Sequence, residues 1–310
     1  MKYYLAPLEG ITTRAYRQLS RKFFGCFDRY YTPFLTPTHE HLLTNRQRQE
    51  LEPVEPGLVP QLLTNVPEDF IWMAGELKAM GYGEVNLNLG CPSGTVVKKH
   101  KGSGLLMDLD RLKALLDPIF AASPLPVSIK TRIGIEDPEE FAPLLALFNE
   151  YPICELTVHP RLQKQQYGGE PHMDCFAYAQ KYSKNPLCYN GDLFSPEDVA
   201  QQEGRVMLGR GAIANPGMIR YLKQGKWASL EEFRAFHDEI YAHCKETMSG
   251  FRPVVFKMRE FWCYWQYLFD APERHLKKIR KAASFAEYGL ALDGLFLESR
   301  YRPDGAFLHE

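Results

Sequence analysis

Short strand-like runs alternate with helix-like segments through the first two thirds of this 310-residue chain. Each run is rich in apolar or β-branched residues and has polar or glycine residues at its carboxyl end. Eight runs can be placed, over residues 3–8, 30–35, 58–63, 85–89, 127–131, 156–159, 187–190 and 206–209. This alternation predicts a (β/α)8 TIM barrel, which takes ~250 residues. A doubly wound sheet would need an early Gly-x-Gly-x-x-Gly after a strand, and no such motif is present.

The segments between these runs carry helix signals. Apolar residues recur at helical spacing within 67–80, 109–120 and 138–148. Ser195-Pro196 is typical of a helix start, because serine caps the first turn and proline suits the first helical position.

No strand pattern follows residue 228. Ser229-Leu-Glu-Glu232 is a capping box, and two apolar stripes at helical spacing come after it. The stripes are Phe233, Phe236, Ile240 and Cys244, then Val254, Val255, Met258, Phe261, Trp262, Trp265 and Phe269. We therefore expect a barrel domain over residues 1–228 and a smaller all-helical C-terminal domain over 229–310.

Charge and cysteine usage narrow the class of protein. The net charge is only −1, so an RNA-binding protein of this composition must gather its positive charge in patches. The seven cysteines include no Cys-x-x-Cys pair, which argues against a disulfide framework or a zinc site and suits a reducing cytoplasm. His39 and His41 are more typical of a solvated loop than of a metal site. No apolar run approaches the ~20 residues of a membrane helix. We expect a cytoplasmic protein without metal or membrane segment and with no evident obligate protein partner.

The run 85–89 carries the strongest local signal, because it stops at Gly90 and is followed at once by Cys91. Its apolar side chains alternate with Asn86 and Asn88, so both amides share one face and can hydrogen-bond a heterocycle. A barrel collects the carboxyl ends of its strands on the face where its chemistry lies. Cys91 is therefore a candidate catalytic residue, although a lone free cysteine is more often simply buried.

Other strand ends carry charged or amide groups. Lys130 and Arg132 lie two residues apart, on one face of the fifth run, and burying such charges unpaired is costly. A fixed cation there would stabilise the anionic reduced ring of a flavin. His159 ends the sixth run, and the amide of Gln61 in the third could meet the edge of a ring; a structural role is the plainer alternative for a strand-end histidine.

Two glycine motifs follow the last two runs. Gly209-Arg-Gly211 offers backbone N–H groups without side-chain obstruction, and the loops in this position often bind phosphate in barrels. Asn190-Gly-Asp192 ends the preceding run and strengthens this interpretation. Taken singly, either motif is equally typical of a tight turn.

Taken together, these motifs resemble the tRNA-dihydrouridine synthases, a family of FMN enzymes. The resemblance is carried by Ala6-Pro-Leu-Glu-Gly10, Asn88-Leu-Gly-Cys-Pro-Ser93, Ser128-Ile-Lys-Thr-Arg-Ile-Gly134, His159-Pro-Arg161 with Gln166-Tyr-Gly168, Asn190-Gly-Asp192 and Leu208-Gly-Arg-Gly-Ala212. They come in the family's order between residue 6 and about residue 217. The C-terminal part is similar to the family's tRNA-binding helical domain, with weaker motif support. Pro160 stands where family members often have glycine.

The resemblance implies reduction of specific uridines in tRNA to 5,6-dihydrouridine, with FMN as cofactor and NADPH as reductant. A hydride would pass from flavin N5 to uracil C6, and Cys91 would give a proton to C5. Such an acid must be a thiol at the moment of transfer, so the lowered pKa of a nucleophilic cysteine is not expected. The uracil would have to leave its stack. Asn88 and Arg132 would face the uracil or the flavin. The residues implied to hold FMN are Pro7, Leu8, Gln61, Lys130, His159, Asn190, Gly191, Asp192, Gly209 and Arg210.

Clusters of basic residues are candidate RNA contacts. Four of them fall at i, i+3, i+4 and i+7, so they share one helical face, roughly opposite Leu276, Ile279 and Ala283. They are Arg274, Lys277, Lys278 and Lys281. A solvated face normally mixes signs, so this unmixed face predicts contact with tRNA phosphates. Lys98 and Lys99 follow Cys91 and could guide the RNA strand. A more ordinary basic cluster, including Arg17, lies within residues 14–22.

Two other classes stay open from the sequence. An FMN barrel oxidoreductase acting on a small molecule, of the dihydroorotate or ene-reductase type, would share the flavin contacts but would not need a basic helical appendage. A non-catalytic RNA-binding protein would not need a cysteine beside a flavin site.

Overall fold

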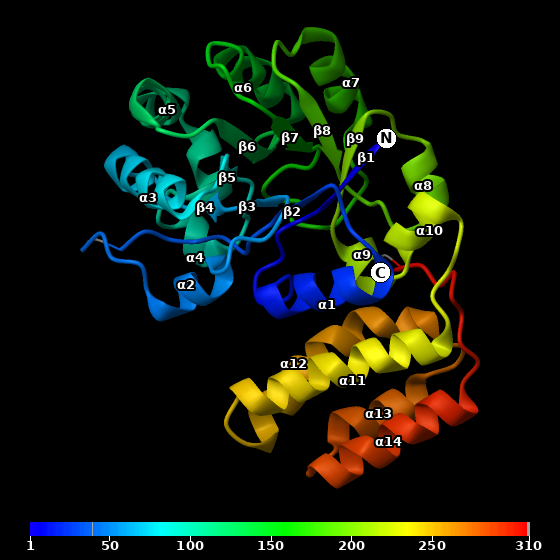
Figure 1. The fold of residues 1–310 in the computed structure, drawn as a ribbon. Helices are drawn as coiled ribbons and strands as arrows, with labels where there is room; N and C mark the ends of the chain where they lie inside the picture. Colours follow the sequence, from blue (N-terminus) through cyan, green and yellow to red (C-terminus); the bar gives the residue numbers. More distant parts are fainter. Residues whose placement is uncertain (39, 309–310) are drawn as a thin grey trace. The chain divides into compact units, whose positions relative to one another are not determined.

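The computed structural model describes residues 1–38 and 40–308. The chain forms two compact units that interleave along the sequence (Figure 1). The first comprises Met1–Glu9, Asp28–Gly191 and Glu203–Met207, and the second comprises Gly10–Phe27, Asp192–Gln202 and Leu208–Glu310. The boundary expected between residues 228 and 229 stays a prediction. Within the described ranges, no helix is both long enough and apolar enough to cross a membrane.

One parallel sheet organises the first unit. In the described residues it has nine strands in the order β3-β2-β1-β9-β8-β7-β6-β5-β4. Their bounds are β1 Lys2–Leu5, β2 Arg29–Tyr31, β3 Leu58–Val59, β4 Gln61–Leu62, β5 Val85–Leu89, β6 Val127–Arg132, β7 Leu156–His159, β8 Leu187–Asn190 and β9 Arg205–Leu208. The two terminal strands of this order, β3 and β4, are separated in sequence only by Pro60. The sheet therefore closes on itself, and the predicted TIM-barrel fold is confirmed.

Prolines shorten three of the predicted strands. The predictions over 3–8, 30–35 and 58–63 were too long, because proline has no N–H for the ladder. β1 ends before Pro7 and β2 ends before Pro33, while Pro60 splits the third predicted strand into β3 and β4. The ladder still continues across that break, since the carbonyl of Pro60 accepts a hydrogen bond from the backbone N–H of Asn86 at 2.8 Å.

Helices follow the strands of the first unit, and Figure 1 shows α3, α5, α6 and α7 outside β4–β8. Their bounds are α2 Asn45–Leu51, α3 Pro67–Met80, α4 Gly94–Val97, α5 Leu109–Ala122, α6 Phe141–Phe148 and α7 Met173–Tyr182, with 3-10 turns at Gly102–Met107 and Pro138–Glu140. The helix predicted over 67–80 is confirmed residue for residue. It starts with a proline, buries the predicted apolar stripe and ends at Gly81, which adopts the left-handed conformation with φ 101°.

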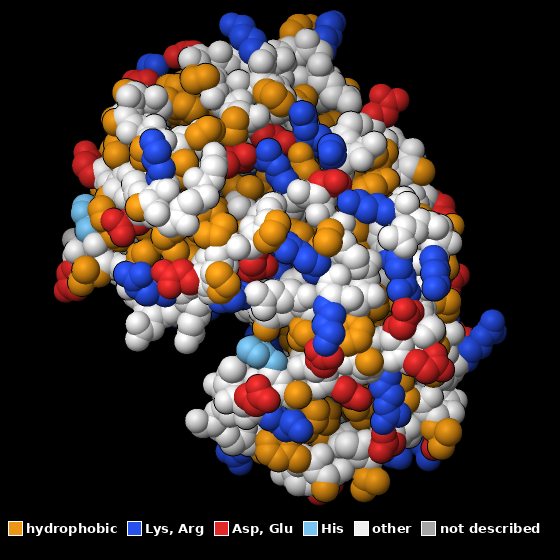
Figure 2. All heavy atoms as spheres, viewed as in Figure 1, with side chains coloured by type: hydrophobic (Ala, Val, Ile, Leu, Met, Phe, Trp, Pro, Cys, Tyr) orange, Lys and Arg blue, Asp and Glu red, His pale blue; other side chains and the backbone are white. Residues whose placement is uncertain are grey.

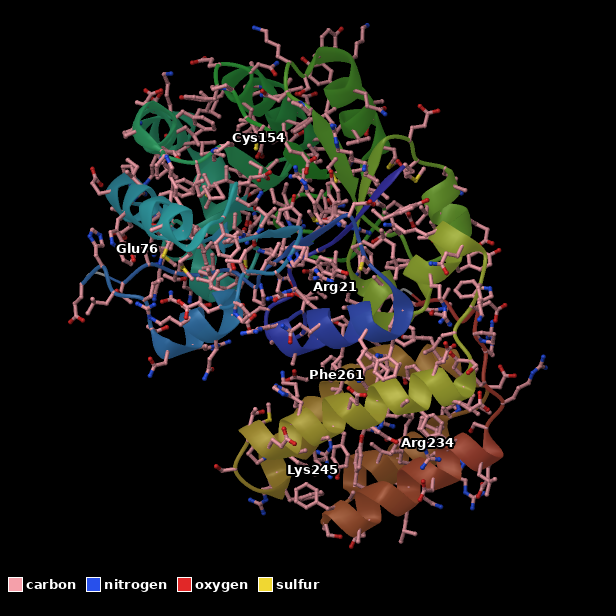
Figure 3. All side chains as sticks on the ribbon, viewed as in Figure 1. Arg21, Glu76, Cys154, Arg234, Lys245 and Phe261 are labelled. Carbon is pink, nitrogen blue, oxygen red and sulfur yellow. The ribbon has the colours of Figure 1, made fainter. Side chains whose placement is uncertain are left out.

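The second unit is helical. Its elements are α1 Arg14–Phe24, α8 Pro196–Ala200, α9 Arg210–Ala214, α10 Met218–Gln224, α11 Leu230–Thr247, α12 Phe251–Trp265, a 3-10 turn at Gln266–Leu268, α13 Glu273–Lys281 and α14 Phe285–Glu298. The predicted helix starts at Ser195 and Ser229 are confirmed, and both serines form capping boxes. Phe261 on α12, labelled in Figure 3, stacks on Tyr16 of α1 with ring centroids 5.8 Å apart, and Phe236 of α11 meets the edge of the same tyrosine.

Two sets of polar side chains are buried in this unit. His237, Tyr288 and Trp262 form a buried polar chain, in which Trp262 Nε1 donates to the Tyr288 hydroxyl at 3.0 Å and that hydroxyl lies 3.0 Å from His237 Nε2. Arg17 is fully buried, with Nη1 donating to the carbonyl of Thr12 at 3.0 Å, so its assignment to a basic surface cluster was wrong. The helix turns this side chain inward, where backbone oxygen replaces water.

Candidate functional site

The predicted site residues of β4–β7 share the interior face of the barrel. Residues opposite each other in a parallel ladder point to the same side of the sheet, and so do residues two apart along a strand. The register pairs are Gln61–Asn86, Asn88–Lys130 and Arg132–His159. Thr157 pairs with both Lys130 and Cys188, and Cys188 packs with Tyr4 and Met207 in the interior cluster. The polar groups therefore line the barrel interior towards the carboxyl ends of the strands.

Four side chains on this face form a hydrogen-bonded row across three strands. Asn88 Nδ2 donates to Gln61 Oε1 at 2.7 Å, and Gln61 Nε2 donates to Asn86 Oδ1 at 2.8 Å. Asn86 Nδ2 then donates to Ser128 Oγ at 2.9 Å. The backbone sets the direction of the row, because Asn88 Oδ1 accepts from the N–H groups of Gly90 and Cys91 and leaves Nδ2 to donate to Gln61. Each amide is thus held in one orientation.

Cys91 is fixed from both sides of its peptide. Its N–H donates to Asn88 Oδ1 at 3.0 Å, and its carbonyl accepts from Ser103 Oγ at 2.8 Å and from the Ser103 N–H at 3.1 Å. Gly102 lets the two segments approach, since a Cβ there would lie 2.9 Å from the Cys91 oxygen and 3.1 Å from the Cys91 Cβ. Its φ of +56° also favours glycine. The cysteine backbone is therefore held rigidly beside the amide row.

The Cys91 thiol stays protonated at neutral pH. Burial raises the pKa of Cys91, and the Ser93 backbone hydrogen bond and the positive charge of Arg132 offset this only in part. The direction agrees with an acid and not with a nucleophilic thiolate.

Lys130 presents an uncommitted cation on the same face. Within residues 1–38 and 40–308, the Lys130 ammonium group forms no hydrogen bond or ion pair. Burial lowers the pKa of Lys130 to about 8, and repulsion by Arg132 acts in the same direction. An anionic ligand here would restore the usual preference for the charged form, so the position favours anion binding.

Arg132 holds three loop carbonyls. It is buried, and it donates from Nε to Gly90 at 3.0 Å, from Nη1 to Leu162 at 2.8 Å and from Nη2 to Gln166 at 2.6 Å. The Tyr167 ring covers its guanidinium at 5.5 Å. Arg132 thus ties the turn before Cys91 to the loop after β7, and its direct contact with a ligand stays a prediction.

His159 ends β7 beside a second buried arginine. Arg161 Nη1 lies 3.4 Å from His159 Nε2, while its Nε donates to Gly168 at 3.3 Å and its Nη2 to Gly169. The half-exposed ring of Tyr167 has its centroid 6.3 Å from that of His159. Arg161 therefore supports both the histidine and the loop that carries Tyr167.

The remaining predicted flavin residues of the first unit lie directly after strands. Asn190 ends β8 and donates from Nδ2 to the Met207 carbonyl of β9 at 2.7 Å, which joins the two strands before Gly191. Pro7 and Leu8 follow β1, where Leu8 packs against the interior cluster. All of them lie at the carboxyl ends of their strands.

Three predicted phosphate-loop residues lie in the second unit. Arg210 Nη2 donates to Asp192 Oδ1 at 2.8 Å, and the guanidinium lies 5.1 Å from the Phe194 ring. Gly209 immediately precedes Arg210, the first residue of α9. Gly211 is required by packing, because a Cβ there would lie 2.1 Å from the Leu193 carbonyl oxygen. Arg210 and Asp192 therefore brace each other, which the sequence did not suggest.

The predicted basic residues are exposed, but some of them lie beside acidic side chains. Lys98 and Lys99 project beyond α4, and Asn65 Nδ2 holds the Lys99 carbonyl at 3.0 Å. In the second unit Arg274, Lys277, Lys278 and Lys281 line a hollow of about 520 Å³ on α13 and α14.

The four cations share one face of α13, as predicted, and Leu276 and Ile279 are buried on the other side of the helix. The surface around this face carries both signs of charge, because α14 adds Glu287 to the hollow and Glu298 lies 3.7 Å from Arg274. Figure 2 likewise shows both signs of charge over the visible face of the helices. The prediction that Ala283 lies on the buried side of this helix was wrong. The helix ends at Lys281, so Ala283 is exposed and Ala282 takes the buried position.

Metal ligands do not cluster in the described ranges, where no group of three or more His, Cys, Asp or Glu side chains could hold an ion. His41 lies 3.0 Å from Asp69 through Nε2 and stacks on Trp72 with ring centroids 4.8 Å apart. His39 lies outside the described residues.

Several supporting residues were missed from the sequence. Ser128 ends the amide row, Ser103 holds the Cys91 carbonyl, and Arg161 supports His159. Ser128, Arg161 and Tyr167 fall within motifs quoted above, so their positions were a signal, although their partners come from other segments. The only sequence signal for Ser103 was its position between two glycines.

The chain is similar to known proteins over most of its length. The family model described as dihydrouridine synthase (Dus) matches residues 4–284. A protein of Synechocystis sp., named "Probable tRNA-dihydrouridine synthase 1", is 31% identical over 224 residues, which are 69% of this chain and 62% of that protein. A relative from Rickettsia conorii, named "Probable tRNA-dihydrouridine synthase", is 27% identical over 81% of this chain and 79% of its own length. A relative of the same name from Staphylococcus epidermidis is 29% identical over 69% of this chain and 69% of its own length. The chain belongs to the dihydrouridine synthase family.

Proposed function

We propose that this protein reduces specific uridines of tRNA to 5,6-dihydrouridine, using FMN and NADPH, with Cys91 as the acid. The single observation that carries the proposal is the fixed, protonated Cys91 thiol beside a polar barrel interior with an uncommitted lysine. Relatives are named for this activity, and the family model covers residues 4–284. The expected cytoplasmic localisation stays a prediction.

The residues present fit a flavin. Lys130 offers an ammonium group with no partner in the described ranges, which suits the anionic reduced ring. Gln61 uses only one amide hydrogen and one lone pair within the row, so its second amide hydrogen and second lone pair can bond the edge of a ring. We propose that Pro7, Leu8 and His159 line the ring and that Asn190 and Gly191 support it. For the phosphate we propose Asp192, Gly209 and Arg210.

The chain itself has two tasks in this reaction. A bound FMN would supply the hydride for uracil C6, with NADPH as its source. Cys91 Sγ donates its proton to C5 and regains one from solvent, so the uracil receives the equivalents of one hydride and one proton. The Asn88 and Ser103 contacts hold the Cys91 backbone, and so the Cα from which the thiol projects, in one place during this transfer. Asn88 and Arg132 are proposed to face the base.

Replacement of the acid tests the proposal. In Cys91→Ala we expect FMN content to be unchanged and multiple-turnover uridine reduction to fall by roughly 10²–10⁴, the usual contribution of a positioned acid. Cys26→Ala, which removes an exposed thiol, is the control. Formation of dihydrouridine at the native rate by Cys91→Ala would refute the acid role.

Substrate class needs a separate measurement. Mass-spectrometric mapping of dihydrouridine in RNA from cells lacking this gene should show loss at defined tRNA positions. An unchanged map would exclude the proposed substrate and leave the small-molecule FMN oxidoreductase, while a purified protein without flavin absorbance would favour the non-catalytic alternative.

A further inference from the structure

The hollow on α13 and α14 joins two kinds of surface. One side carries Arg274, Lys277, Lys278 and Lys281 from the basic face of α13. The other side is apolar, with Leu290 and Ala291 of α14. Leu290 is 74% exposed, so its apolar surface is open to a ligand at the hollow. A surface that only attracted phosphate would not need this apolar side.

The one carboxylate in the hollow already has a structural role. Glu287 accepts a hydrogen bond from the backbone N–H of Ala283 at 2.9 Å, and its own N–H donates to Ser284 Oγ at 3.2 Å. Glu287 thus closes the cap at the start of α14. Glu298, outside the hollow, lies 3.7 Å from Arg274, so Glu287 stands against three lysines and the hollow keeps an excess of positive charge. A ligand that suits both sides combines an anionic group with an apolar face.

We propose that this hollow binds one unpaired nucleotide of the RNA substrate, with its phosphate at the lysines and the face of its base against Leu290. The inference rests on the proposed function, because it takes RNA as the partner. A base inside a duplex has both faces covered by its neighbours, so only an unpaired nucleotide can present a face to a side chain. The volume of about 520 Å³ lies in the usual range of ligand pockets.

A pair of leucine variants isolates the apolar contact. Leu290→Ser removes the apolar side of the hollow, and Leu297→Ser removes a leucine 87% exposed on the same helix but outside it. Both exchanges have the same helix propensity and expose no core. Binding of a labelled oligouridylate to the flavin-loaded, oxidised protein would be measured by fluorescence anisotropy. The same strand paired with oligoadenylate serves as the duplex probe.

We expect Leu290→Ser to weaken binding of the single strand about fivefold, the effect of losing part of one leucine contact, and to leave duplex binding unchanged. Leu297→Ser should bind both probes as the native protein does. Equal affinity of the two variants for the single strand would overturn the proposal. Competition by free uridine monophosphate as strong as that by the oligonucleotide would also overturn it, since the site would then serve a free nucleotide.

This measurement needs no turnover, so it is independent of the chemistry. If Leu290→Ser and Leu297→Ser differ in RNA affinity but the deletion strain keeps its tRNA dihydrouridine, the RNA-binding hollow stands and the proposed reaction is refuted. If the deletion strain loses dihydrouridine but the two variants bind RNA equally, only the proposed hollow is refuted.

Discussion

Asn88→Ala should disturb the reaction more than it disturbs the fold. The substitution deprives three buried or half-buried groups of their partner: the N–H groups of Gly90 and Cys91, and Gln61 Oε1. At about 1 kcal/mol for each lost hydrogen bond, the barrel unit should lose about 3 kcal/mol. The peptide of Cys91 would then be held only through its carbonyl, by Ser103.

Asn86→Ala is the matched control. It breaks the same row one step away, at Gln61 Nε2 and Ser128 Oγ, and leaves the contact between Asn88 and Cys91 in place. Its expected loss of stability is about 2 kcal/mol by the same measure. The two variants thus differ little in stability but differ in whether the sulfur keeps its position.

Single-turnover oxidation of the reduced, flavin-loaded enzyme by unmodified tRNA measures the chemical step, and urea unfolding measures stability. We expect the rate of Asn88→Ala to fall at least about tenfold below that of Asn86→Ala, because small displacements of a reacting group are costly. In a Cys91→Ala background, Asn88→Ala should cause a smaller loss of rate than in the native enzyme, and the loss that remains measures the proposed contact of Asn88 with the base. Equal rates for the Asn86 and Asn88 variants would refute the positioning role.

Three further outcomes are expected. FMN affinity should weaken as the pH rises through about 8, because the ligand-free Lys130 then loses its charge, and Lys130→Gln should abolish this dependence in fluorescence titrations. Neutralising Lys277, Lys278 and Lys281 together should weaken tRNA binding and reduce its salt dependence without loss of flavin, as measured by anisotropy at several salt concentrations. The helical unit should lose stability below about pH 6.5. Burial lowers the pKa of His237, so the unfolded chain takes up a proton first and the stability present above the unfolded pKa is lost as the pH falls towards the folded one. Urea midpoints followed by tryptophan fluorescence measure this.

Each of these has a contradicting result. Unchanged FMN affinity between pH 7 and 9 would show that Lys130 does not meet the flavin. Unchanged tRNA affinity of the triple variant at moderate salt would show that α13 is merely solvated. A urea midpoint independent of pH between 5 and 7 would show that protonation of His237 is not linked to unfolding.

The local periodicity of the sequence determined where many of the helices and strands of this protein form. The helix at 67–80, the strand at 85–89 and the capping box at Ser229 follow from residues close together in sequence, and the structure has each of them. The strand ends followed less well where Pro7, Pro33 and Pro60 interrupt the ladder, although proline itself is a visible signal. The strand pattern likewise placed Cys91 directly after one strand and Lys130 near the carboxyl end of the next, which the structure confirms.

Only the tertiary structure decided which groups meet. The barrel closes because β3 and β4 pair with strands far away in sequence, and the register then aligns Gln61, Asn86, Asn88 and Ser128 into one row. Helical spacing put four cations on one face of α13, but the packing of α14 brought Glu287 and Leu290 to the same hollow. Spacing along one segment fixes the direction of its own side chains, whereas partners depend on how distant segments pack, and no local pattern contains that information.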